Sequence, residues 1–124
     1  MKNQQSTYLL STKVYGDPDK PQVVLLHGIA TNSTIWRHTI RLLSQDYRVV
    51  TIDLLGHGKS PKPDDVAYTT ELHADSIAHT LRARGLNARS AFVGFSIGAL
   101  ITEKLAEKYP EFVGSAMLIA PPVY

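Results

Sequence analysis

Residues 94–98, Gly-Phe-Ser-Ile-Gly, combine the residue types and the spacing that a nucleophilic serine requires. An apolar run typical of a β-strand, 90–93, precedes them, and apolar side chains at helical spacing follow from residue 97. A strand that turns directly into a helix leaves little room, so Ser96 must be strained and Gly94 and Gly98 must lack side chains. The hydroxyl would then lie at a helix N-terminus, which favours developing negative charge. The pattern predicts a nucleophile at Ser96, although a small-residue turn that packs a helix on a sheet would read the same.

A second segment with suitable chemistry is His27-Gly28-Ile29, which follows the apolar run 23–26. An enzyme that attacks an acyl carbon needs two backbone N–H groups to bind the oxyanion, one after the nucleophile and one from a neighbouring loop. Ile97 would supply the first N–H and Ile29 the second, and Gly28 would let the backbone come close. A plain turn is the alternative interpretation.

The loop that begins at Asp53 is close to a phosphate-binding sequence but departs from it. In Asp53-Leu-Leu-Gly-His-Gly-Lys-Ser60 an aspartate stands where the phosphate motif needs its first glycine. Pro61 and Pro63 also block the helix that should follow. We therefore expect a tight glycine-rich loop beside the site, and no bound nucleotide.

None of the five histidines is well placed in sequence to act as the general base. His27 and His57 flank the proposed site, where either could orient a loop. Asp75 and His79 are four residues apart in an expected helix, which favours a solvated surface pair over a pair of metal ligands. No metal site is predicted.

The elements that must position these segments alternate along the chain. Strand patterns cover 8–15, 23–26, 47–52, 90–95 and 112–119, and helical patterns cover 34–43, 70–84 and 97–108. This alternation predicts a three-layer α/β/α sandwich around a mostly parallel sheet, with right-handed crossovers. Ligands bind at the carboxyl ends of the strands in such sheets, and His27, Asp53 and Ser96 all lie at such ends.

Composition limits the other classes of function. The chain of 124 residues is long enough for one domain, and it has no cysteine for disulfides or thiolate metal sites, which favours an intracellular setting. Thirteen basic and eleven acidic residues give a net charge of +2 without a basic patch, so nucleic acid is not an expected partner. The polar start and the short apolar runs predict no signal region and no membrane span, hence a soluble, cytoplasmic protein.

Taken together, the motifs resemble the N-terminal half of an α/β-hydrolase-fold protein of the lipase/esterase, C–C hydrolase and proline iminopeptidase type. The resemblance covers nearly all of residues 8–124 and rests on 24–28, Trp36, 53–60, 94–98 and 120–122. It implies that Ser96 is the nucleophile and that the N–H groups of Ile29 and Ile97 form the oxyanion hole. The residues expected to shape the site around them are His27, Gly28, Trp36, Gly94, Phe95 and Gly98.

The chain departs from the family after the serine. The family places its catalytic acid and histidine on loops after later strands, but residues 97–124 contain neither His nor Asp. Glu103, Glu107 and Glu111 belong to a helix and turn expected to point away from Ser96. We therefore expect one partial domain, 1–124, a truncated fold that lacks the cap, the last strands, the acid and the histidine, with negligible turnover by itself.

The expected function is that of a serine hydrolase acting on esters, amides or related acyl substrates, without a metal or organic cofactor. One alternative is a non-catalytic fragment that acts by self-association or binding, and another is an acyltransferase or perhydrolase that uses the same serine. The strand from Phe112 to Ile119 would have one bare apolar edge, so a homodimer through this edge is expected.

Overall fold

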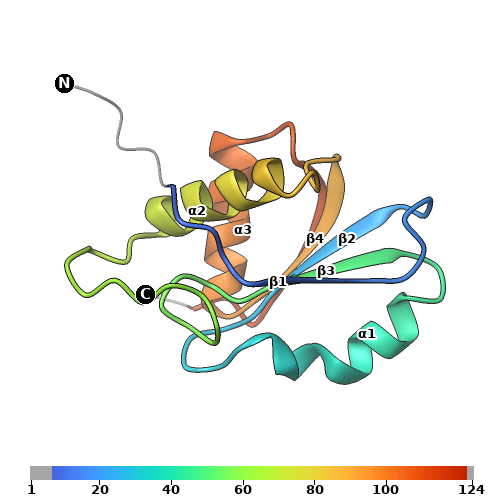
Figure 1. Ribbon diagram of the computed structural model, residues 1–124, viewed down its shortest axis with the longest axis horizontal. Helices are drawn as coiled ribbons and strands as arrows, with labels where there is room; N and C mark the ends of the chain where they lie inside the picture. Colours follow the sequence, from blue (N-terminus) through green and yellow to red (C-terminus); the bar gives the residue numbers. More distant parts are fainter. Residues whose placement is uncertain (1–6, 123–124) are drawn as a thin grey trace.

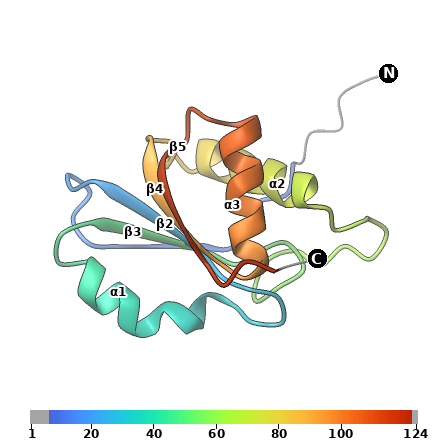
Figure 2. The same cartoon turned by 180° about the vertical axis from the view of Figure 1, so that it is seen from behind.

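A five-stranded sheet forms the centre of the computed structural model, which describes residues 7–122. The strands are β1 (Thr12–Tyr15), β2 (Gln22–Leu26), β3 (Arg48–Ile52), β4 (Ser90–Phe95) and β5 (Val113–Ile119), and the helices are the 3-10 helix η1 (Ser33–Trp36), α1 (Arg37–Leu43), α2 (Thr70–Ala83) and α3 (Ile97–Lys108). The sheet order is β1-β3-β2-β4-β5, and only the β1–β3 pair is antiparallel. Helix α1 covers one face, and α2 and α3 cover the other (Figures 1 and 2). The predicted three-layer, mostly parallel α/β fold is confirmed.

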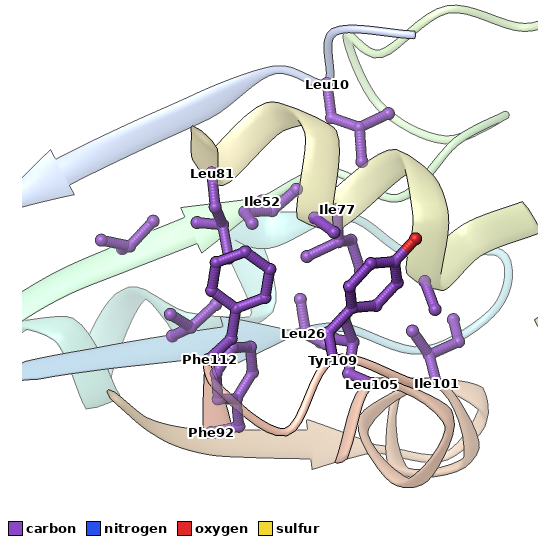
Figure 3. Close-up of a cluster of buried hydrophobic side chains, with 14 of the residues drawn as sticks. Leu10, Leu26, Ile52, Ile77, Leu81, Phe92, Ile101, Leu105, Tyr109 and Phe112 are labelled. Carbon is purple, nitrogen blue, oxygen red and sulfur yellow. The ribbon is translucent and has the colours of Figure 1, made fainter. Parts of the chain in front are cut away.

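The core lies mainly between the sheet and the helices α2 and α3. Strand β2 reads Gln-Val-Val-Leu-Leu and is buried along its whole length, as expected for the central strand of a parallel sheet. Leu26, Phe92, Ile77 and Leu105 belong to the larger cluster, which Figure 3 shows enclosed between β-strands and helices. A smaller cluster lies under α1, where Trp36 packs with residues of β2 and β3. Each fully buried side chain of this size contributes roughly 1.5–3 kcal/mol to folding.

The first strand is shorter than predicted. Residues 8–11 do not pair as a strand, because α2 competes for their backbone groups: the Leu10 N–H donates to Thr80 Oγ1 at 3.0 Å and Arg84 donates to the Leu10 carbonyl at 3.0 Å. Strand β5 likewise begins one residue later than predicted. Phe112 precedes it and is 2% exposed, in the larger core cluster.

The expected solvated pair of Asp75 and His79 is a wrong prediction. Asp75 is only 6% exposed and accepts hydrogen bonds from Tyr109 Oη at 2.5 Å and from Lys108 Nζ. Helical spacing placed Asp75 near His79, but the spacing alone could not show that α3 packs against that side of α2. The contact ties α2 to α3, and burial together with this hydrogen bond raises the pKa of Tyr109 to about 12.

None of the helices between residues 7 and 122 combines the length and the apolar character needed to cross a membrane.

Candidate active site

Ser96 occupies the corner between β4 and α3 in a strained backbone conformation. Its φ is 60° and its ψ is −122°, a region that residues with a side chain rarely adopt. The Ser96 N–H donates to the carbonyl of Ile119 at 2.9 Å, so the end of β5 supports the corner. Strain of this kind costs on the order of 1–3 kcal/mol and is concentrated at functional positions.

Both glycines that flank Ser96 are required by the close packing of α3 on the sheet. A Cβ on Gly98 would lie 2.5 Å from the carbonyl oxygen of Leu26 and 2.6 Å from that of His27. A Cβ on Gly94 would lie 2.3 Å from the carbonyl oxygen of Gly98. These distances are far below van der Waals contact with rigid backbone, so the first turn of α3 can approach the end of β2 only with glycine at both positions.

The loop after β2 lies directly against Ser96. A Cβ on Gly28 would come within 3.1 Å of the Cβ of Ser96 and within 3.1 Å of the Phe95 ring. Within residues 7–122 the N–H groups of Ile29 and Ile97 donate to no protein acceptor. Two unpaired backbone donors therefore lie on the two segments that meet at the serine, as an oxyanion-binding site requires.

The carbonyl of Gly28 is held by two side chains. Thr31 Oγ1 donates to it at 2.7 Å, and His27 Nδ1 lies 2.7 Å from it. The C=O and N–H of a trans peptide point in opposite directions, so this clamp turns the Ile29 N–H away from Thr31. Sequence reasoning missed Thr31. Its position three residues after Gly28 was the available signal, because hydroxyl groups often bond to nearby backbone.

His27 is a buried, neutral link between two loops. Since a carbonyl can only accept, Nδ1 carries the hydrogen that goes to Gly28, and Nε2 accepts the Leu54 N–H at 2.9 Å. Burial is the main reason that its pKa lies below the ordinary value, and the neighbouring His57 lowers the pKa further. Both ring nitrogens are engaged, which leaves neither available to take a proton from Ser96.

The loop after β3 is fixed by the carboxylate of Asp53. Its oxygens accept the N–H groups of Ser33 at 2.9 Å and Lys59 at 3.0 Å. Burial would raise the pKa of this carboxyl, but the two N–H groups, together with the nearby Ser33 hydroxyl and His27, outweigh burial and hold the pKa below its usual value. A Cβ on Gly58 would lie 2.3 Å from Asp53 Oδ2, so the tight glycine-rich loop closes directly around the carboxylate.

The remaining residues singled out from the sequence lie in other surroundings. Trp36 is 6% exposed and packs beneath α1 in the smaller core cluster. Glu107 pairs with Lys104 at 2.7 Å and Glu111 with Arg82 at 3.1 Å, so both are engaged in surface ion pairs. Within residues 7–122 no imidazole contacts the Ser96 hydroxyl, and no three His, Asp or Glu side chains are arranged to hold a metal ion.

Comparison with known proteins identifies related chains. A family described as "alpha/beta hydrolase fold" matches residues 21–124. The chain is 36% identical over 107 residues to the "Probable lysophospholipase BODYGUARD 1" of Arabidopsis thaliana, a match that covers 82% of this chain and 23% of the plant protein. It is 33% identical over 100 residues to the "Pimeloyl-[acyl-carrier protein] methyl ester esterase" of Aeromonas hydrophila, covering 81% of this chain and 37% of the esterase.

Solved structures agree with these matches. A "membrane phospholipase A", described as a bacterial virulence factor, superimposes with a TM-score of 0.88 at 30% identity, over 97% of this chain and 38% of the phospholipase. "Est816", an N-acyl homoserine lactone degrading enzyme, gives a TM-score of 0.85 at 31% identity, over 97% of this chain and 44% of that enzyme. The chain therefore spans less than half of the length of each of these relatives.

Proposed function

This chain belongs to the α/β-hydrolase family, and on that premise we propose that it carries the nucleophile and the oxyanion-binding groups of a serine hydrolase. The observation that carries the proposal is the geometry at Ser96. Ser96, with φ at 60°, lies against the Gly28 backbone, and the N–H groups of the next residues, Ile29 and Ile97, have no acceptor within residues 7–122. A positive φ is costly for serine, so the surrounding structure must enforce this conformation. The conformation presents the Ser96 hydroxyl at the corner between β4 and α3, as a nucleophile requires.

The proposed reaction proceeds through an acyl-enzyme. Ser96 Oγ attacks the carbonyl carbon of the substrate, and a general base takes the hydroxyl proton. The N–H groups of Ile29 and Ile97 stabilise the negative oxygen of the tetrahedral intermediate. The same base returns its proton to the leaving group, and water then releases the acyl group by the reverse sequence of proton transfers. We assign the base to a histidine outside these 124 residues, because no imidazole of the described residues contacts the Ser96 hydroxyl and both ring nitrogens of His27 are engaged.

Carboxylic esters are the substrate class that we propose. The similar proteins are described as a lysophospholipase, a methyl ester esterase and an N-acyl homoserine lactone degrading enzyme, and each of these names points to a substrate that contains a carboxylic ester bond. An ester also has a better leaving group than an amide, so it depends less on proton donation. Transfer of the acyl group to an acceptor other than water would reveal itself as a product rate that rises with acceptor concentration.

Chemical rescue tests the proposal directly. We expect the chain to hydrolyse a p-nitrophenyl ester at close to the background rate, because Ser96 lacks a base. Added imidazole can act as a diffusible base, so the rate should then exceed that of the Ser96→Ala variant measured at the same imidazole concentration. Equal rates for the two chains at every imidazole concentration would contradict a nucleophilic Ser96. Turnover without imidazole that is lost in Ser96→Ala would instead show that a base is present.

A second function, self-association, is favoured by the open edge of the sheet. Among residues 7–122, strand β5 pairs only with β4, and its residues after Val113 are all exposed, with Met117 at 61%. A long apolar edge recruits another strand, so we propose a two-fold dimer in which β5 pairs with β5 of a second copy. Sedimentation should show a concentration-dependent dimer that Met117→Lys weakens. A wild-type chain that stays monomeric at all concentrations would refute it.

A further inference from the structure

A cavity of about 410 Å³ lies between the edge strand β1 and the η1–α1 segment. Helix α1 has only seven residues and packs over β2 and β3, where Val23, Leu25 and Val49 form the smaller core cluster with Trp36. On the same face of the sheet, Tyr15 of β1 packs against the edge of this cluster, and the cavity lies beside it, between β1 and the η1–α1 segment (Figure 1 shows β1 and α1). Its volume is within the range of small-molecule binding sites.

The cavity carries an excess of positive charge. Lys13 from β1, Arg37 from α1 and Lys59 from the loop after β3 all line it. Across residues 7–122 none of these three side chains forms an ion pair or a hydrogen bond. The acidic lining residue, Asp53, already accepts two backbone N–H groups. Three cations and one carboxylate leave a net charge of +2 on the lining.

Neutral donors lie among these charges. The Ser33 Oγ is buried and makes no hydrogen bond of good geometry in the described part of the chain, although it lies near enough to the Asp53 carboxylate to help lower the pKa of that carboxyl. Thr51 is the register partner of Lys13 on the neighbouring strand, and its side chain also lines the cavity. A buried hydroxyl without a partner costs free energy, which a ligand oxygen would recover by accepting from it.

We propose that this cavity binds a small organic phosphate monoester. A monoester carries close to two negative charges at neutral pH, which matches the +2 of the lining. The guanidinium of Arg37 presents paired donors suited to phosphate oxygens, and the two lysines add point charges. The volume leaves room for an organic group beside the phosphate. The binding mode differs from a nucleotide phosphate loop, because cationic side chains from three separate elements hold the anion.

Calorimetric titration of the 124-residue chain with glycerol 3-phosphate tests the proposal. We expect saturable binding, weakened about tenfold or more in Arg37→Gln, because a hydrogen bond to a charged group contributes about 1.5–3 kcal/mol. Arg41→Gln is the matched control: it removes the same charge from the same helix, but Arg41 does not line the cavity. Its affinity should equal that of the wild type.

Three outcomes would overturn the proposal. These are the absence of saturable binding, an equal loss of affinity in Arg37→Gln and Arg41→Gln, or binding of inorganic phosphate without binding of glycerol 3-phosphate. The measurement does not depend on chemistry at Ser96, so a Ser96→Ala chain should bind glycerol 3-phosphate as the wild type does.

Discussion

At the scale of single residues, the carbonyl of Gly28 decides where the Ile29 N–H points. Thr31 Oγ1 and His27 Nδ1 both hold this carbonyl at 2.7 Å. In Thr31→Val the Gly28 carbonyl keeps only the His27 donor, so we expect the peptide between Gly28 and Ile29 to rotate part of the time. The rate at which a fluorophosphonate phosphonylates Ser96 should then fall several-fold, up to about tenfold.

Thr31→Ser separates orientation from packing. The serine keeps the hydroxyl but loses the methyl group, so it should retain the wild-type rate of phosphonylation, while Thr31→Val should not. If both variants react at the wild-type rate, Thr31 does not position the peptide.

The sequence predicted some of these residues and missed others for physical reasons. The motif around Ser96 predicted the two glycines and the serine because that corner allows few alternatives. Thr31 was missed because many loop hydroxyl groups lie three residues from a carbonyl, and this spacing alone does not show which of them bond to it. Asp75 was misjudged because its partners, Lys108 and Tyr109, lie more than thirty residues away, at the end of α3 and just after it.

At the scale of elements, the contact between α3 and β2 holds the site together. A side chain at Gly98 would collide with backbone carbonyls at 2.5 and 2.6 Å. Gly98→Ala should therefore push α3 away from the sheet and lower the free energy of unfolding by about 1–3 kcal/mol or more. Urea unfolding followed by circular dichroism measures this loss.

Gly114→Ala is the matched control for Gly98→Ala. In β5 the added Cβ would meet Arg89 Cγ and the Ser90 carbonyl oxygen, both at 3.4 Å, which is ordinary van der Waals contact. The free energy of unfolding should change by no more than roughly 0.5 kcal/mol. If Gly98→Ala and Gly114→Ala lower the free energy of unfolding equally, the close contact of α3 with β2 does not require glycine at position 98.

The sequence predicted the type and order of the elements, but it was less informative about their ends. The helix expected over 34–43 divides into η1 and α1, and the strand expected over 8–15 begins at Thr12. The ends depend on distant partners, such as Thr80 of α2 and Arg84, the residue after α2, whose side chains bind the Leu10 backbone. Periodicity reports only which face of an element is apolar.

At the scale of the whole molecule, buried neutral histidines make stability depend on pH. Burial is the largest cause that lowers the pKa of His73 to about 4, and His57 and His27 add to it. In the unfolded chain the pKa of His73 is about 6.5. At a pH between about 6.5 and about 4, the unfolded chain therefore binds a proton at His73 that the folded chain does not bind. His73 should therefore cost up to about 1.4 kcal/mol of stability for each unit that the pH falls through this window.

Urea unfolding from about pH 7 to about pH 5 measures this dependence. The slope of the free energy of unfolding against pH should become smaller in His73→Leu, because leucine cannot bind the proton. His79→Leu on the same helix is the control, since the His79 side chain is half-buried. An unchanged slope in His73→Leu would show that His73 is not buried in its neutral form.

The fold class was predictable because strand and helix patterns alternate over the whole chain, and parallel strands bring their carboxyl ends to one edge. The cavity beside β1 was not predictable. Its lining comes mainly from β1, η1, α1 and the loop after β3, and local patterns do not encode how these separate segments are placed in space.

The central claim is that the fold presents Ser96 as a nucleophile beside an assembled oxyanion site. Site-resolved mass spectrometry after treatment with excess fluorophosphonate tests it most directly, with the exposed Ser115 of β5 as an internal reference and Ser96→Ala as the control. Oxyanion-binding groups alone retain part of the catalysis when the triad is incomplete, so Ser96 should be phosphonylated at least about tenfold more than Ser115 in the folded chain. This preference should vanish on unfolding. Equal occupancy of Ser96 and Ser115 in the folded chain would contradict the claim.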